Sequence, residues 1–557
     1  MIQFKVIDGL LLRDMAIAGN ALLEKHRETV DALNVFPVPD GDTGTNMSLT
    51  MQSAIREINS REFLRADEAA SALAKGALKG ARGNSGVITS QLLRGFAKAL
   101  NGTDRITPVQ FANAMKAGAD QAYKAVMKPK EGTILTVARV MAEDALKQVQ
   151  KDPDSFDALF DVIMRSGQAI LQKTPEMLPV LKQANVVDSG GSGLMYIYAG
   201  YAAVLNGKAL EEILAENAVD DGKFVDDHDA LEDVEGMYCT SYQIIHTGDD
   251  CEETDIDSLR RRLNRIGNRV NVEGDLSCIS VHVHTQHPGS AVEDGLELGD
   301  LIELKIENIA ETRRQKYAAE HPETASKNEN APDEVVEEKE FGMVAVSLGE
   351  GFSQIFHDLS VDVIVEGGQT MNPSIEDIES AIQAAHARTV FVFPNNGNVI
   401  LAAQQAASLT ENIQVHVIPT KNVAMGIAAA VAFQPDADAQ QNAENMEIAA
   451  QHVRTATITY AVRDSEYNDI HISQGDIIGL HNGVIEYRGD DISEVAIRTV
   501  GAIMDEESEL VTVYYGADTS EADAEKLSEK ISQMYPDADV ECHKGGQPLY
   551  YYLISVE

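Results

Sequence analysis

Residues 34–47 read NVFPVPDGDTGTNM, and this stretch does most to define both the fold and the chemistry of the chain. It places two prolines and two aspartates, Asp40 and Asp42, between long segments with helical spacing. On a helix, two residues at this spacing point about 200° apart, but in a loop rich in proline and glycine their carboxylates can converge. Hard oxygen ligands in such a loop suit Mg²⁺, which completes its shell with water and substrate phosphates. The stretch therefore predicts a magnesium loop between helices, and Asn34 could supply or orient a further ligand.

An ordinary turn, in which Asp40 or Asp42 caps the next helix, would use the same residue types. Three further segments favour a nucleotide site. Each places glycine directly before a helical run, where N–H groups and the helix dipole can receive phosphate. These segments are ARGNSGVITSQLLRG (81–95) with Ser85 and Gly86, KPKEGTILTVAR (128–139) with Thr133, and NVVDSGGSGL (185–194) with Asp188.

The sequence lacks the common phosphate-binding loops of α/β proteins. It contains neither a Walker A pattern nor a dinucleotide fingerprint. Phosphatases that form an aspartyl-phosphate also use aspartates two residues apart, but theirs follow a buried strand. Pro37 and Pro39 make such a strand unfavourable here. The nucleotide site is therefore expected among helices.

Composition narrows the possible partners. The 557 residues include 45 Lys and Arg against 89 Asp and Glu, a formal net charge of −44. Such a surface repels nucleic acid and anionic lipid headgroups and suits a basic protein surface better, although solubility alone accounts for most of the excess. Four irregularly spaced cysteines do not form a disulfide framework. No signal peptide is apparent, and residues 189–207 have the pattern of a buried helix, not a membrane span, so a cytoplasmic protein without membrane insertion is expected.

The chain divides into regions that differ in hydrophobic spacing and charge. Residues 1–208 place apolar side chains at helical spacing almost throughout. Alternating strand-like runs with two short helical ones predict a small α+β domain over 209–317. Residues 318–340 are dense in charge and predict a flexible acidic linker. From 341 to 557, short β-rich runs alternate with helical segments as in parallel α/β proteins, and a final unit of mixed strands and helices begins near residue 455.

The first 200 residues, roughly, resemble the nucleotide-binding subunit of the dihydroxyacetone kinases, whose hallmark loop Asp-x-Asp-x-Gly-x-Asn-Met occurs here as DGDTGTNM (40–47). In domain order, the whole chain resembles the bacterial fatty acid kinase A-subunit, in which a central domain and a DegV-like region follow. The resemblance implies a helical barrel whose acidic loop holds two Mg²⁺ ions between aspartates and the phosphates of ATP. The kinase subunits have a third aspartate shortly before the pair, where this chain has Asn34. The implied metal ligands are Asp40 and Asp42, and the implied nucleotide-contacting segments contain Thr43, Thr45, Asn46, Ser85, Gly86, Thr133 and Asp188.

A second candidate site lies in the central region. The run ISVHVHT (279–285) alternates, so His282 and His284 are expected on one face of a strand, with Cys239 on a neighbouring strand. A surface histidine pair is often incidental, and a Cys-His-His set would suit zinc, although a set of three without a near fourth ligand does not favour it. The resemblance instead implies that these three residues are needed for phosphoryl transfer and that the central domain dimerises. A fatty acid carboxylate is already ionised at neutral pH, so it needs neutralisation of charge and no general base.

The predicted function is an ATP- and Mg²⁺-dependent fatty acid kinase catalytic subunit that makes acyl-phosphate for phospholipid synthesis. The segments AVSLGEG and GGQTMNPS lack the Ser/Thr-rich pattern with which DegV-type proteins hold a carboxylate. Residues 341–557 are therefore expected to dock a separate DegV-type fatty-acid-binding protein, not to hold lipid. The alternatives are a dihydroxyacetone-type small-molecule kinase and a non-catalytic nucleotide-sensing regulator.

Overall fold

The computed structural model contains two compact units, one made of residues 1–219 together with 336–557 and the other of residues 220–335. The residues that it describes are 4–34, 41–217, 238–245, 253–275, 278–285, 287–296, 298–308, 339–368, 371–461, 465–467, 470–481 and 483–557. Asp40 and nearly all of the expected linker (318–340) lie outside these residues.

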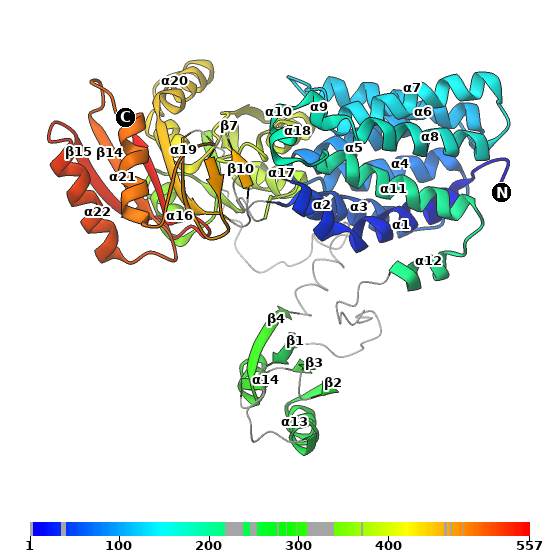
Figure 1. Cartoon of the computed structure of the whole chain (residues 1–557), viewed down its shortest axis with the longest axis horizontal. Coiled ribbons are helices and arrows are strands. Elements are labelled where there is room, and N and C mark those ends of the chain that lie inside the picture. The colour runs from blue at the N-terminus through cyan, green and yellow to red at the C-terminus, as the bar shows by residue number, and fades with distance from the viewer. Residues whose placement is uncertain are drawn as a thin grey trace. The chain divides into compact units, whose positions relative to one another are not determined.

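The N-terminal part of the first unit is helical, as predicted, and its long helices lie side by side (Figure 1). Its helices are α1 (Gly9–Lys25), α2 (Arg27–Leu33), α3 (Thr43–Asn59), α4 (Ala66–Lys79), α5 (Gly83–Ala99), α6 (Pro108–Ala125), α7 (Ile134–Lys151), α8 (Phe156–Leu171), α9 (Thr174–Met177), α10 (Pro179–Ala184), α11 (Ser189–Leu205) and α12 (Leu210–Asn217). Their apolar stripes form one continuous core. Helices α1 and α11 lie close together where Gly19 meets Gly200, since a β-carbon on Gly200 would lie 2.4 Å from the Gly19 nitrogen.

The C-terminal part of this unit begins with a parallel sheet in the order β6-β5-β7-β8. The strands are β5 (Lys339–Ser347), β6 (Val363–Glu366), β7 (Ala387–Phe393) and β8 (Gln414–Val417), and the helices are α16 (Glu350–Asp358), α17 (Ile375–Ala384), α18 (Ile400–Leu409), α19 (Val423–Val431) and α20 (Ala439–His452). Two separate apolar clusters cover the two faces of the sheet, which explains the uninterrupted apolar runs of β5 and β7.

A six-stranded mixed sheet follows, in the order β13-β12-β9-β16-β14-β15, and among these described strands the parallel pair is β14 with β15. The strands are β9 (Arg454–Tyr460), β12 (Ile477–His481), β13 (Val484–Gly489), β14 (Leu510–Tyr515), β15 (Asp539–Lys544) and β16 (Tyr552–Val556). Helices α21 (Ile492–Ile503) and α22 (Glu521–Met534) pack on this sheet, and β10 (Ser465–Tyr467) pairs with β11 (Ile470–Ile472). The expected succession of an α/β and an α+β fold is confirmed.

The second unit is a small α+β domain, as predicted. Its antiparallel sheet has the order β2-β3-β1-β4. The strands are β1 (Tyr238–Ile245), β2 (Gly267–Asp275), β3 (Cys278–Thr285) and β4 (Asp300–Asn308), and the helices are α13 (Glu253–Ile266) and α14 (Pro288–Leu296).

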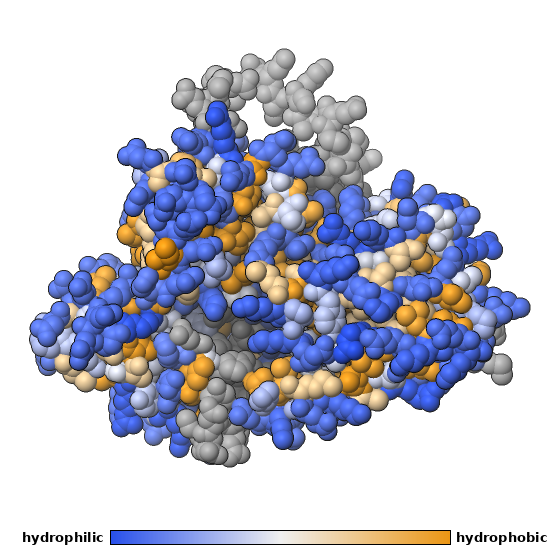
Figure 2. All heavy atoms as spheres, turned by 90° about the horizontal axis from the view of Figure 1, so that it is seen from above, coloured by the Kyte–Doolittle hydropathy of each residue, from blue (hydrophilic) through white to orange (hydrophobic). Residues whose placement is uncertain are grey.

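Hydrophilic side chains cover most of the described surface on the face drawn in Figure 2, with apolar groups scattered between them. Within the described residues, no helix is both long enough and apolar enough to cross a membrane.

Candidate functional site

The described end of the acidic loop meets the first turn of α3. Asp42 occupies the N-cap position of that helix, but its side chain does not cap it. Asp31, from α2, takes that role: its Oδ1 accepts hydrogen bonds from the Gly44 N–H at 2.6 Å and the Thr45 N–H at 3.1 Å. The Thr45 hydroxyl donates to Asp31 Oδ2 at 2.8 Å. The Asp42 carboxylate is thus not used as a helix cap, which removes the simplest alternative to a ligand-binding role for this residue.

Asp31 was missed in the sequence because it lies within α2, two residues before the end of the helix and outside the motif. Burial raises the pKa of its carboxyl above the usual value, although the hydrogen bonds from Thr45 and Gly44 act in the opposite direction. Asn34 ends α2, and its backbone N–H donates to the carbonyl oxygen of Asp31 at 3.0 Å. Its predicted role as a metal ligand stays a prediction.

Helix α5 begins beside α3. The glycines in the first turn of α5 allow the two helices to come close together. Gly83 has a φ of +56°, and a β-carbon there would lie 2.6 Å from Asn46 Nδ2. A β-carbon on Gly86 would lie 2.3 Å from the Thr50 hydroxyl oxygen. The N-cap residue Arg82 makes no side-chain capping hydrogen bond, and the N–H groups at such a helix start are suited to an anion. Ser85 belongs to this first turn, whereas the glycine-rich pattern placed it directly before the helix.

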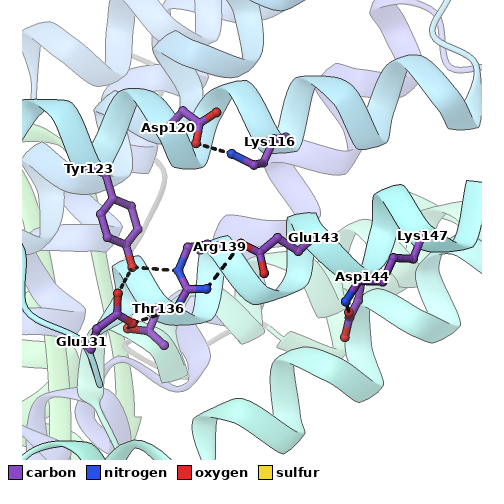
Figure 3. Close-up of polar contacts among 9 residues, drawn as sticks. All are labelled: Lys116, Asp120, Tyr123, Glu131, Thr136, Arg139, Glu143, Asp144 and Lys147. Atoms are coloured by element: carbon purple, nitrogen blue, oxygen red, sulfur yellow. Dashed lines mark hydrogen bonds and ion pairs between the residues drawn. The ribbon is translucent and has the colours of Figure 1, made fainter.

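A polar network fixes the loop that precedes α7 (Figure 3). The Glu131 carboxylate accepts hydrogen bonds from the hydroxyls of Tyr123 at 2.9 Å and Thr136 at 2.7 Å, and from Arg139 at 2.8 Å. The Thr136 hydroxyl oxygen in turn accepts a hydrogen bond from the Gly132 N–H at 2.8 Å. Burial opposes ionisation of Glu131, but these hydrogen bonds outweigh it and lower the pKa of the carboxyl.

The start of α11 completes the arrangement. The Asp188 side chain accepts a hydrogen bond from the Gly191 N–H at 2.7 Å, and its hydrogen bond with the Ile134 backbone ties this helix to the first turn of α7, next to Thr133. Burial raises the pKa of Asp188 to about 6, although both hydrogen bonds act in the opposite direction. The neighbouring Ser189 hydroxyl donates to the Thr43 hydroxyl at 3.2 Å.

These contacts bring the starts of four helices, α3, α5, α7 and α11, to one end of the helical domain. Thr43 and Asn46, in the first turn of α3, are buried, with exposed fractions of 5% and 4%. Glycine-rich helix starts beside the Asp42 carboxylate are chemically suited to a phosphate chain with its magnesium. The donor set present here therefore fits Mg²⁺ with a nucleotide. In the described parts of the chain, no cluster of three His, Cys, Asp or Glu side chains that could hold a metal occurs, but Asp40 lies outside them.

The C-terminal part also reaches this end of the helical domain, and Asn372 contacts Asp42 itself. Asn372 lies on the loop before α17, and its Nδ2 donates a hydrogen bond to Asp42 Oδ2. No sequence motif signals this contact, because the two residues are 330 positions apart.

In the second unit, His282 and His284 lie on the central strand β3 with ring centroids 5.1 Å apart, as the alternation predicts. His284 is fully buried. Cys239, on the neighbouring strand β1, is directly opposite His284 in the antiparallel register. The backbone of the Cys-His-His set is thus assembled across two strands.

Comparisons with known proteins agree with this architecture. The DAK2 domain matches residues 37–203, and the middle and C-terminal domains of fatty acid kinase A-subunit-like proteins match 235–316 and 342–557. Protein YloV of Bacillus subtilis is 41% identical over 561 residues, which cover 100% of both chains. An uncharacterized protein of Staphylococcus aureus strain USA300 is 38% identical over 558 residues, 99% of each chain.

Among solved structures, a DegV family protein from Corynebacterium glutamicum matches 39% of this chain and 97% of its own, with 15% identity and a TM-score of 0.31, a likeness too weak to bear on function. The assignment to a family rests on the 41% identity to YloV over the full length and on the three matched domains. The chain belongs to the fatty acid kinase A-subunit-like family.

Proposed function

We propose that this chain is the ATP- and Mg²⁺-dependent catalytic subunit of a fatty acid kinase. The observation that best supports the proposal is the gathering of four helix starts near Asp42, whose side chain does not cap α3. The N–H groups at these starts would bind the phosphates of ATP. Thr43, Thr45, Asn46, Ser85, Gly86, Thr133 and Asp188 are the proposed nucleotide-binding residues.

Asp40 and Asp42 would hold the magnesium, with Asn34 as the third candidate ligand and two ions as the expected number. Bound Mg²⁺ supplies neutralisation of the negative charge shared by the phosphates. Asp31 keeps the loop in place by anchoring the first turn of α3. The two aspartates thus have different proposed roles. Asp31 holds the backbone of the first turn of α3, and Asp42 binds the metal.

The acceptor is the carboxylate of a fatty acid. One of its oxygens attacks the γ-phosphorus of ATP, the bond from that phosphorus to the β–γ bridging oxygen breaks, and ADP leaves with the electron pair. The products are acyl-phosphate, a precursor for phospholipid synthesis, and ADP. The carboxylate, with a pKa of roughly 4–5, carries no proton to remove, so Cys239, His282 and His284 are assigned to stabilising the transferred group, without zinc.

A separate DegV-type fatty-acid-binding protein would deliver the acyl chain to the C-terminal part of this cytoplasmic enzyme. The net charge of −44 favours a carrier with a basic patch over direct extraction from an anionic membrane. We also propose a homodimer through the second unit. Its edge strand β4 exposes Ile302, Leu304 and Ile306 to 40%, 49% and 44%, an apolar row that an identical strand could cover.

The test measures ADP release from ATP and Mg²⁺ with oleate, with and without a DegV-type carrier, and with dihydroxyacetone as the competing acceptor. The proposal requires turnover that depends on both oleate and carrier, and a loss of at least about 100-fold in Asp42→Asn. Asp8→Asn is the matched control, because Asp8 caps α1 next to Leu64, beyond the far end of α3, and should leave turnover unchanged. Turnover on dihydroxyacetone alone, or no turnover with any acceptor, would refute the assignment.

A further inference from the structure

The C-terminal part of the first unit is joined to the helical domain at the candidate nucleotide site. Ala81 and Val87, around the start of α5, belong to the same apolar cluster as Ile375 and Ile378 of α17. The Ile375 N–H donates to the Ala81 carbonyl at 3.2 Å. The joint therefore has an apolar core, and both backbone and side-chain contacts hold the two parts together.

Polar contacts surround this core. Lys79 pairs with Glu376 at 2.9 Å, and Gln91 donates to Gln405 at 3.1 Å. Several independent contacts thus hold the two parts together. The loss of any single polar contact should leave the joint closed.

Asn372 differs from these contacts because it touches the acidic loop itself. Its Nδ2 donates to Asp42 Oδ2, and its backbone carbonyl accepts a hydrogen bond from Arg82 at 2.8 Å. Arg82 precedes α5, so the loop that carries Asn372 is pinned between the starts of α3 and α5. The orientation of the amide is set by Asp42, since only the NH₂ group can face a carboxylate oxygen.

The second amide atom points to a ligand. Asn372 is only 2% exposed, and its Oδ1 is buried without a hydrogen-bond partner among the described residues. A buried, unpaired amide oxygen is costly, and such groups are rare unless a water, ion or ligand completes them. Asn372 also lies beside the glycine-rich start of α5, where a β-carbon on Gly83 would be 3.4 Å from its Nδ2.

We propose that Asn372, supplied by the C-terminal part, is a positioning residue of the nucleotide site: it holds the Asp42 carboxylate in place for the metal, so that Mg²⁺–ATP binding in the helical domain depends on the docked C-terminal part. The inference rests on the proposed function. Carboxylates that ligate metals are themselves held by hydrogen bonds from outside the ligand set, and loss of such a bond lowers metal affinity by about 10- to 100-fold.

The test uses the full chain and a non-hydrolysable ATP analogue titrated with Mg²⁺, with nucleotide binding followed by calorimetry. Asn372→Ala should raise the Mg²⁺ concentration for half-maximal binding by about 10- to 100-fold. Asn372→Leu, which keeps the volume but removes the amide, should do the same. Gln405→Ala, which removes an amide contact of the same joint at a distance from Asp42, should leave the Mg²⁺ midpoint unchanged.

Two further readouts separate this role from a structural one. Limited proteolysis should give the same pattern for wild type, Asn372→Ala and Asn372→Leu, since the joint keeps its core. In an Asp42→Asn background, Asn372→Ala should have no further effect on the Mg²⁺ midpoint. Unchanged midpoints in both Asn372 variants, or an equal shift in Gln405→Ala, would overturn the inference. Absence of Mg²⁺–ATP binding in the wild type would instead refute the proposed function, so the two failures are distinguishable.

Discussion

Replacement of Asp31 gives the most direct test of how the acidic loop is held. In Asp31→Ala, the N–H groups of Gly44 and Thr45 and the Thr45 hydroxyl all lose their acceptor. Loss of an N-cap costs about 0.5–2 kcal/mol, and a hydrogen bond to a charged group contributes about 1.5–3 kcal/mol. Water can reach this half-buried position, and the burial that raises the Asp31 pKa already reduces the benefit of its charge. We expect a net destabilisation of about 2 kcal/mol.

Asp31→Asn separates the contribution of the cap from that of the charge. Both N–H groups donate to the same oxygen, Oδ1, and an asparagine oxygen can accept both. Asparagine is also as good an N-cap as aspartate. This variant should therefore lose less than about 1 kcal/mol.

The assay is amide hydrogen exchange of the first turn of α3, combined with thermal unfolding. Exchange at Gly44 and Thr45 should accelerate in Asp31→Ala and remain near wild type in Asp31→Asn. Asp8→Ala removes a comparable cap, that of Leu11 at 3.0 Å, and should lower stability without affecting Gly44. Unchanged exchange at Gly44 in Asp31→Ala would refute the assignment of Asp31 as the anchor of the loop.

Three other outcomes can be checked. Gly200→Ala should destabilise the helical domain by about 1–3 kcal/mol in denaturant unfolding, because its β-carbon would meet the backbone of α1, whereas Gly397→Ala, with open space around it, should be nearly neutral. The Asp188 pKa of about 6 lies above its usual value of 3.8, so its charged form disfavours folding, and stability should fall by about 2–3 kcal/mol as pH rises from 4 to 7. Asp188→Asn, which keeps an N-cap oxygen, should remove that part of the pH profile in urea titrations. Glu131→Gln should lower the free energy of unfolding by about 1 kcal/mol above pH 5. The loss should shrink as pH falls through the lowered Glu131 pKa. The Gly132 N–H should also exchange faster.

Local patterns predicted the helical domain and the positions of its helix starts well. The glycines of ARGNSG mark real close contacts, since a side chain on Gly83 or Gly86 would collide with α3. Alternation placed His282 and His284 on one strand correctly. The sequence did not predict the roles of Asp31 and Asn372. The role of Asp31 depends on α2 folding against α3, and that of Asn372 on a distant loop docking at the same place. Periodicity reports which face of an element is buried, but not which distant element covers it.

The position of Asn372 bears on how a carrier bound far from ATP could influence the nucleotide site. Asp31 fixes the start of α3 from within the helical domain, while Asn372 reaches Asp42 from the part proposed to receive the carrier. The two parts share the apolar cluster of Ala81 and Ile375, and a packed joint transmits displacement better than a flexible tether. If docking of the carrier moves the loop of Asn372, binding linkage requires reciprocity: the factor by which the carrier changes affinity for Mg²⁺–ATP equals the factor by which Mg²⁺–ATP changes affinity for the carrier. Loss of the Asn372 amide should then reduce both factors together, which a change confined to the carrier-binding surface would not do.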